Sequence, residues 1–383
     1  MTHPRNRRVA SVLLGLTLML GACSQPATQV QTPNATQVAV VETQGRTASQ
    51  IEAQTGMHVV TLSARTGLAV LRGTPAHTLR ALNTGSEGAA PQTETTVHVP
   101  EAHMSGGHIA WIDGGHIAWI DGGHIAWIDG QKDDLQVQLD TTTTTNTTGA
   151  GITVAVIDTG VDLNHPMLKE AYTPATQWVD LVDGDATPSD TAAAADGGFG
   201  HGTAVASLVR RAAPGARILP MRVLDHNGTG QTGDVAAAIL MAVDRGANVI
   251  NLSLGTDEDV PAINAAVDAA QAAGVLVLSA VGNAGLSVAD APARNAGLGA
   301  LHLSVSSLMR DGTSAPWNNG GRGEVQAPGE QLIAAVPGGY AHWSGSSMST
   351  AVASGAVARA LAGGLTPAQV ATEFTGQATF NLH

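Results

Sequence analysis

The sequence predicts an α/β protein whose main domain is a parallel sheet between two helical layers, preceded by a small α+β domain. From Gly149 onward, short apolar runs alternate with alanine-rich stretches. This alternation is typical of right-handed βαβ units, whose helices cover both faces of a parallel sheet. Residues 37–100 instead suggest the order strand, helix, strand, strand, helix, strand, which is ferredoxin-like. With 383 residues and 43% apolar side chains, the chain can bury a large core.

The apolar runs of the main domain, which we place at residues 149–383, are short and rich in Val, Ile and Leu. Runs of this kind are typical of strands buried on both faces. The expected strands are residues 152–157, 218–223, 249–254, 275–280 and 301–305. The expected helices include residues 235–245 and 261–273, and two more that begin near His201 and Ser347.

The small domain is expected at residues 37–103. Its strand candidates are rich in Val and its helix candidates begin at Thr residues, which favour helix N-caps. The expected strands are residues 38–41, 57–63, 67–71 and 95–99. The expected helices are residues 47–55 and 74–82.

Three polar side chains stand where these elements begin or end. Asp158 follows the first strand, while His201 and Ser347 lie at the starts of helices. Because the carboxyl ends of parallel strands meet at one sheet edge, we expect the three side chains to lie together. A serine hydroxyl needs a base within hydrogen-bond reach and a third group that orients that base. The sequence therefore predicts an activated serine nucleophile.

The segments V-I-D-T-G at Asp158, G-H-G-T-A at His201 and G-S-S-M-S-T-A at Ser347 resemble the subtilisin-like serine protease family, in the same order. The resemblance implies a subtilisin-like catalytic domain in which these three residues form the triad. It also implies that Asn283, after the strand 275–280, donates a hydrogen bond to the oxyanion. Ser253, Leu254 and Gly255 resemble the family strand that pairs with the substrate backbone. Without the other motifs, Asn283 would be interpreted as a turn residue, and Ser347 as a small packing residue or a helix cap.

Asp290 precedes Ala-Pro-Ala. In the family, the corresponding stretch forms part of the floor of the pocket that binds the substrate side chain preceding the scissile bond. A carboxylate there would favour Arg or Lys in the substrate. The alternative is a solvated loop residue, because the loop from Asn283 to Pro292 is shorter than the family's.

The chain also departs from the family pattern. Met167 stands where the family often has a calcium-binding Asp, and Ala351 and Val352 replace the usual Pro and His after the nucleophile. Calcium takes six to eight oxygen ligands. We therefore expect no calcium at this position, and we expect no metal and no cofactor in the reaction.

The N-terminus is typical of an export signal. Three arginines precede an apolar run in residues 1–22, and Leu-Gly-Ala then leads to Cys23, which resembles a bacterial lipobox. The resemblance implies that Cys23 carries a lipid and anchors the exported chain to a membrane of the cell envelope; the alternative is an ordinary secretory signal with secretion after processing. Cys23 is the only cysteine, so no intramolecular disulfide can form. Residues 23–36 are expected to be a flexible tether.

Residues 104–148 are expected to be a linker. They hold three identical copies of Gly-His-Ile-Ala-Trp-Ile-Asp-Gly at 107–130 and a Thr-rich tract at 141–148. We interpret the repeats as a tandem duplication that can pair with an edge strand. The alternatives are a metal site built from the repeated histidines and a partner surface built from the tryptophans. We expect maturation cleavage between Gly130 and Thr148.

Charge and composition narrow the function. The chain has 18 basic and 31 acidic residues, a net charge of −13, which disfavours nucleic acid as a partner. We expect a monomeric exported serine endopeptidase that acts on polypeptides and is inhibited by its own N-terminal propeptide. The alternatives are a catalytically silent, lipid-anchored peptide-binding protein of the same fold, and a peptide ligase with the same chemistry.

Overall fold

The computed structural model describes residues 35–75, 89–100, 147–297, 300–320 and 323–375, together with five two-residue strands. The expected export signal at 1–22, Cys23, most of the expected tether and most of the expected linker lie outside the described residues. So does most of the expected helix at 74–82. Within the described part of the chain, no helix has the length and apolar character needed to cross a bilayer.

The main domain is built on a seven-stranded sheet in which every neighbouring pair is parallel. In spatial order the strands are β11 (Val179–Asp180), β12 (Arg217–Arg222), β10 (Thr153–Asp158), β14 (Val249–Leu252), β15 (Leu276–Ala280), β16 (His302–Leu308) and β17 (Val325–Pro328). The five predicted strands are confirmed, and β11 and β17 extend the sheet at its two edges.

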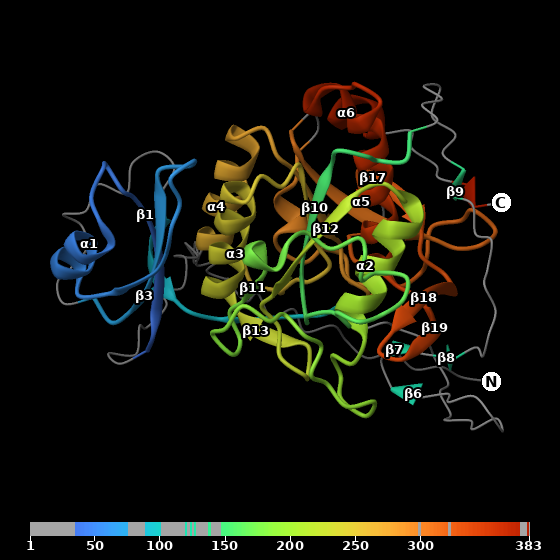
Figure 1. Ribbon diagram of the computed structural model, residues 1–383, viewed down its shortest axis with the longest axis horizontal. Helices are drawn as coiled ribbons and strands as arrows, with labels where there is room; N and C mark the ends of the chain where they lie inside the picture. The colour runs from blue at the N-terminus through green and yellow to red at the C-terminus, as the bar shows by residue number, and fades with distance from the viewer. Residues whose placement is uncertain are drawn as a thin grey trace, which may run out of the picture. The chain divides into compact units, whose positions relative to one another are not determined.

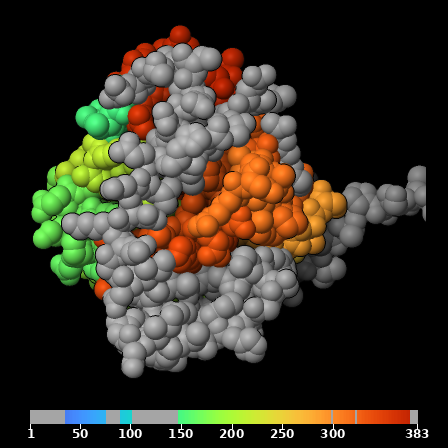
Figure 2. Space-filling model, turned by 90° about the vertical axis from the view of Figure 1, so that its right-hand side faces the viewer, coloured from blue at the N-terminus to red at the C-terminus, as the bar shows by residue number. Residues whose placement is uncertain are grey.

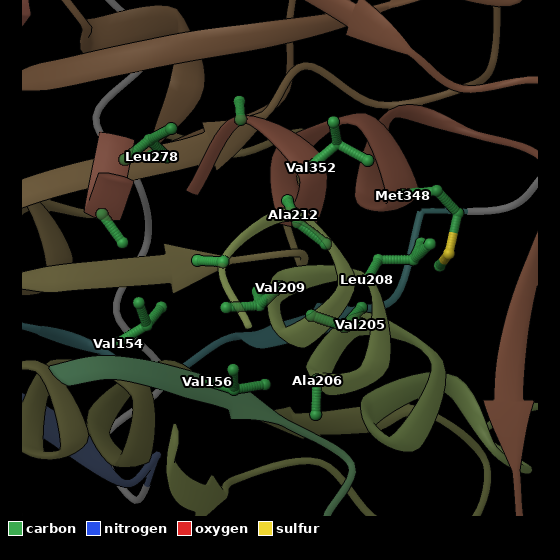
Figure 3. Packing of buried hydrophobic residues seen from close by; sticks show 14 of the residues in the cluster. Val154, Val156, Val205, Ala206, Leu208, Val209, Ala212, Leu278, Met348 and Val352 are labelled. Carbon is green, nitrogen blue, oxygen red and sulfur yellow. The ribbon is translucent and has the colours of Figure 1, made fainter. Parts of the chain in front are cut away.

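Helices cover both faces of this sheet, as predicted (Figure 1). One face carries α2 (His201–Ala212) and α5 (Ser346–Ala362), and the other carries α3 (Thr232–Asp244) and α4 (Pro261–Ala272). Successive residues of β10 alternate between the layers: Val154 and Val156 pack with α2 and α5, as Figure 3 shows, whereas Ala155 and Ile157 pack with α3 and α4. This period of two explains the uninterrupted apolar run, because a strand buried on both faces has no solvent-facing side.

Shorter elements complete the main domain. They are the 3-10 helices η2 (Ala175–Gln177) and η3 (Ala293–Asn295), the helix α6 (Pro367–Phe374), the strand β13 (Thr229–Gln231), and a hairpin of β18 (Leu332–Val336) and β19 (Gly339–Trp343). The hairpin ends just before α5. Figure 2 shows the face of the molecule on which the later part of this domain, in orange and red, reaches the surface.

The small domain is an antiparallel sheet of order β2-β3-β1-β4 with the helix α1 (Ala48–Thr55) on one face. Its strands are β1 (Gln37–Glu42), β2 (His58–Leu62), β3 (Leu68–Gly73) and β4 (Ala89–Thr93). The order and the hairpin between β2 and β3 agree with the predicted ferredoxin-like pattern. The face opposite α1 belongs to the same hydrophobic cluster as α3 and α4, to which Val38, Val40 and Val70 contribute fully buried side chains.

The prediction that residues 95–99 complete this sheet is wrong. The fourth strand is β4, and the following strand β5 (Thr96–His98) leaves the small domain to pair antiparallel with β13. Judged from the sequence, Pro91 disfavours a strand at residues 89–93. In the structure β4 is an edge strand, where a residue without an N–H is tolerated.

Four of the two-residue strands lie in the linker and one at the C-terminus: β6 (Trp119–Ile120), β7 (Gly123–His124), β8 (Ala126–Trp127), β9 (Val137–Gln138) and β20 (Asn381–Leu382). The strand β8, in the third octapeptide, pairs antiparallel with β19 and makes the hairpin a three-stranded sheet (Figure 1). The expectation that a repeat can pair with an edge strand is confirmed for this copy.

Candidate active site

Asp158 and His201 lie against each other at the carboxyl edge of the parallel sheet. Asp158 is the last residue of β10 and His201 is the first residue of α2. The distance between His201 Nδ1 and Asp158 Oδ1 is 2.7 Å, and both side chains are buried. The backbone N–H of Thr159 also donates to Asp158 Oδ1, at 2.7 Å. A buried carboxylate in this position holds the imidazole in one orientation, with Nε2 left available as a base.

Small residues allow the two segments to approach this closely. A Cβ on Gly202 would lie 2.1 Å from the carbonyl oxygen of Gly160 and 3.1 Å from Asp158 Oδ1. The hydroxyl of Thr159 accepts a hydrogen bond from the Gly202 N–H at 3.0 Å. Gly202, which follows the histidine, therefore packs directly against Thr159 and Gly160, which follow the aspartate. All three residues lie within the predicted motifs.

Ser347 is the second residue of α5 and is buried. Its hydroxyl donates to the backbone carbonyl of Ser253 at 3.3 Å, and no hydrogen bond among the described residues joins it to His201. The ring of Trp343 packs edge-on against His201, with 5.8 Å between centroids. Catalytic hydrogen bonds are often long or misaligned before a substrate is in its reactive geometry, so this arrangement is compatible with a nucleophile and a base.

Asn283 is held in one orientation by the loop before the nucleophile. Its Oδ1 accepts a hydrogen bond from the Ser346 N–H at 2.8 Å. Its Nδ2 is thereby turned outward, and it donates to the backbone carbonyl of Pro100 at 3.2 Å. A Cβ on Gly345 would lie 2.9 Å from this Nδ2, so a glycine is needed beside it. The side chain predicted to bind an oxyanion thus binds a peptide carbonyl.

That carbonyl follows a stretch of chain bound as a strand, β5. β5 pairs with β13 on one side, and on the other His98 and Gly255 exchange two backbone hydrogen bonds of 3.0 and 2.9 Å. The next amide, Val99 N–H, donates to the carbonyl of Gly228 at 2.9 Å. All of these bonds use backbone groups, as expected for a site that accepts many sequences.

The predicted substrate-binding residues 253–255 therefore divide by role. Gly255 bonds the bound strand through its backbone, whereas the Leu254 side chain is fully buried in the core. The Ser253 hydroxyl donates to the carbonyl of Ser347 at 2.9 Å, and its own carbonyl accepts from the Ser347 hydroxyl.

Asp290 is buried beside Gly255 and Gly282, which disagrees with the alternative of a solvated loop residue. A Cβ on Gly282 would lie 2.2 Å from Asp290 Oδ2, and one on Gly255 would lie 2.9 Å from Asp290 Cβ. Asn319 Nδ2 donates to Asp290 Oδ1 at 3.0 Å. Burial raises the pKa of this carboxyl, and the hydrogen bond from Asn319 partly opposes that shift. The side chain thus borders Gly255, which bonds the bound strand at His98, and Gly282, which directly precedes Asn283.

Two features of the site were missed by the sequence analysis. Asp190 accepts a hydrogen bond from the Gly200 N–H at 2.8 Å, which fixes the residue before His201, and burial raises the pKa of Asp190 to about 6. No local pattern marks this residue. The second feature is β13, for which the Asn-Gly-Thr-Gly preceding Gln231 was the available signal, because glycines permit close backbone approach.

The positions where the chain departs from the family pattern lie in or against the core. Ala351 and Val352 are buried on α5, and Met167 packs against the same hydrophobic cluster. None of the three has a polar side-chain atom that could ligate a hard cation.

Comparison with known proteins agrees with this geometry. Residues 149–379 match the Subtilase family. A thermophilic serine proteinase of Bacillus sp. (strain AK1) is 36% identical over 213 residues, covering 52% of this chain and 50% of that protein. Thermitase of Thermoactinomyces vulgaris is 36% identical over 213 residues, covering 53% of this chain and 72% of that protein. The crystal structure of a cold adapted subtilisin-like serine proteinase matches 65% of this chain and 94% of its own, with a TM-score of 0.53 and 30% identity. This chain thus spans only half the length of the Bacillus relative. Since the family match covers more than half of its residues, the chain belongs to the subtilase family.

Proposed function

We propose that this chain is an exported serine endopeptidase that hydrolyses peptide bonds in polypeptide substrates. His201 removes the proton from Ser347, whose oxygen attacks the substrate carbonyl. The proton then passes from His201 to the leaving amine as the peptide bond breaks, which leaves an acyl-enzyme. Asp158 stabilises the imidazolium, and Asn283 together with the backbone N–H of Ser347 stabilises the oxyanion. Water then releases the acyl group, with His201 again acting as the base.

The observation that carries this proposal is the bound strand at residues 96–100. A polypeptide backbone lies between β13 and Gly255, and its last described carbonyl accepts a hydrogen bond from Asn283. This carbonyl belongs to the chemical group that a protease attacks. The pair of His201 and Asp158 lies at the same sheet edge, at 2.7 Å.

We propose further that the small domain acts as an inhibitory propeptide. Its sheet shares a hydrophobic cluster with α3 and α4, and polar contacts hold both ends of α3. At the N-terminus the Glu94 carboxylate accepts from the Gly233 N–H at 3.3 Å; at the C-terminus the Arg65 guanidinium donates to the carbonyl of Val243. These charges complement the helix dipole. Docking in this manner supports delivery of residues 96–100 to the cleft, where they exclude other substrates.

The remaining parts of the proposal rest on the sequence. The export signal at 1–22 and a lipid on Cys23 would place the enzyme in a bacterial cell envelope, or outside the cell after processing. We propose a monomer without nucleic-acid partners, in keeping with the net charge of −13. Asp290 would favour Arg or Lys before the scissile bond, because its carboxylate borders the cleft and could pair with a cation there.

One observation favours a second candidate, a silent peptide-binding protein. The Ser347 hydroxyl is bonded to the carbonyl of Ser253 and not to a base. A protein that only held peptides would need the backbone contacts of the cleft but would not need the pair of Asp158 and His201.

The test compares the chain without residues 1–22 with its Ser347→Ala variant, following casein hydrolysis and chain length. Ser349→Ala is the matched control, since that serine lies on the same helix and its hydroxyl bonds to Ser307 Oγ at 3.0 Å and to the Pro328 carbonyl at 3.2 Å. We expect the wild-type chain and Ser349→Ala to degrade casein and Ser347→Ala to be inactive. Equal behaviour of the wild-type chain and Ser347→Ala would establish the binding function instead.

A further inference from the structure

Four buried polar residues form a chain of hydrogen bonds that ends on the proposed nucleophile. The Ser354 hydroxyl donates to Asn251 Oδ1 at 3.1 Å, and Asn251 Nδ2 donates to the Ser253 hydroxyl at 2.9 Å. The Ser253 hydroxyl then donates to the backbone carbonyl of Ser347 at 2.9 Å. The first three residues are fully buried and Ser347 is 2% exposed, so solvent cannot replace a lost partner.

The periods of a helix and a strand bring these residues together. Ser347 and Ser354 are seven residues apart on α5, close to two helical turns, so they lie on one face of the helix. Leu252 of β14 packs with α3 and α4, on the other side of the sheet. Asn251 and Ser253, on either side of Leu252 in the chain, therefore face α5.

The bonds of this chain run in one direction. Ser354 has one hydroxyl proton and gives it to Asn251 Oδ1, so Asn251 Nδ2 faces Ser253. Ser253 accepts that bond and has its own proton left for the carbonyl of Ser347. A second bond between the same two residues runs the opposite way, from the Ser347 hydroxyl to the carbonyl of Ser253 at 3.3 Å. When that hydroxyl turns to His201 for the reaction, the second bond breaks, and the bond from the Ser253 hydroxyl remains.

We propose that Ser253, oriented by Asn251, is a positioning residue that holds the backbone of Ser347 in place during the reaction. This inference rests on the endopeptidase function proposed above. It separates the Ser253 side chain from the substrate-binding role expected for residues 253–255. The placement of Ser347 matters twice, because its hydroxyl is the nucleophile and its backbone N–H would bind the oxyanion. A displacement of about 1 Å can lower a rate roughly 10²-fold.

Ser207 provides a matched control. It is also fully buried, and its hydroxyl donates to the carbonyl of Ala204 at 2.8 Å and accepts from the N–H of Ala335 at 2.9 Å. Neither partner is one of the proposed catalytic residues. A serine that only stabilises the core should therefore behave on substitution as Ser207 does.

The test measures kcat and KM on a chromogenic peptide, together with urea unfolding of each variant. Ser253→Ala should lower kcat by roughly 10- to 10²-fold and leave KM unchanged, because the backbone contacts of the cleft remain. Ser207→Ala should lose comparable stability but keep the wild-type kcat. Should Ser253→Ala not fold, Ser253→Cys fills the same space with a weak donor and should also lower kcat. Equal kcat values for the Ser253 and Ser207 variants would overturn the proposal.

Asn251→Asp tests the orienting amide without a change of shape. An ionised carboxylate can only accept hydrogen bonds, so the proton of Ser253 should turn to it and away from Ser347. At alkaline pH we expect a lower kcat than in Asn318→Asp, a matched control whose buried amide bonds to the backbone of Ser307. Equal kcat values in these two variants would overturn the role of Asn251.

One measurement separates this proposal from the endopeptidase function. The ¹³C chemical shift of a peptide carbonyl falls when a hydrogen bond to it is lost, so the shift of the Ser347 carbonyl should fall in Ser253→Ala and not in Ser207→Ala. An unchanged shift in Ser253→Ala would refute the proposal whether or not the enzyme is active. A wild-type chain that hydrolyses neither casein nor the peptide would refute the endopeptidase, and the shift alone would then decide whether Ser253 holds Ser347.

Discussion

Arg72 is the residue that we expect to contribute most to docking of the small domain, through two carboxylates on different parts of the chain. Its Nη2 lies 2.7 Å from Glu94 Oε1 and 2.8 Å from Asp234 Oδ1, the latter in the first turn of α3. The carboxylate side chains are only 5% and 11% exposed. Replacement by Met would leave two buried like charges without their cation.

The size of the effect follows from this burial. Breaking a buried ion pair by removing one partner costs about 3–5 kcal/mol. The Arg72 side chain is 29% exposed, so we take the lower end. A loss of about 3 kcal/mol is a change of roughly 150-fold in the docking equilibrium.

Hydrogen exchange in the Ser347→Ala background measures that equilibrium. The amides of His98 and Val99 bond only to residues of the main domain, so they exchange when β5 leaves the cleft. Arg72→Met should accelerate their exchange roughly 150-fold, by the same conversion. The control Arg46→Met should leave the rates unchanged, because the Arg46 guanidinium donates hydrogen bonds to Glu42, Thr43 and Gln54, all within the small domain.

A second variant separates charge from packing. In Arg72→Met combined with Glu94→Gln and Asp234→Asn, no uncompensated charge remains, and most of the protection should return. If Arg72→Met alone changes the exchange rates less than threefold, the ion cluster does not hold the small domain and the reasoning is refuted.

Three further outcomes can be checked. Asn283→Ala should lower turnover of a chromogenic peptide by roughly 10²- to 10³-fold, the effect known for such a donor in subtilisin; a change below tenfold would mean that this amide does not bind the oxyanion. Burial lowers the pKa of His302 to about 4, so about 3 kcal/mol of stability, present above pH 6.5, should be lost as the pH falls toward 4; urea unfolding of His302→Gln should lack this acid-dependent loss. The raised pKa of Asp190, about 6, acts with the opposite sign: its contribution of about 3 kcal/mol is present below pH 3.8 and is lost as the pH rises through 6. The free energy of unfolding of the wild-type chain relative to Asp190→Asn should therefore fall over that interval, and a flat difference would contradict the shift.

The sequence predicted the elements of the main domain well because their signals are local. Uninterrupted apolar runs such as 152–157 and 275–280 gave strands, and Pro261 marked the start of α4. The last strand of the small domain was misplaced at 95–99, and no strand was predicted at 89–93, where Pro91 disfavours one. Only the pairing with β1 or with β13 distinguishes them.

By itself, the sequence determined which groups the site contains and in what order. Asp158, His201 and Ser347 were recognisable because their neighbours, mostly small residues, satisfy local requirements of turns and helix starts. Only the tertiary structure decided which distant residues meet: Asp190 with the residue before the histidine, Arg72 with Asp234 of α3, and residues 96–100 with β13, Gly255 and Asn283. These contacts join residues far apart in the chain. The contacts of residues 96–99 are hydrogen bonds between backbone groups, so their register cannot be predicted from side-chain patterns in the sequence.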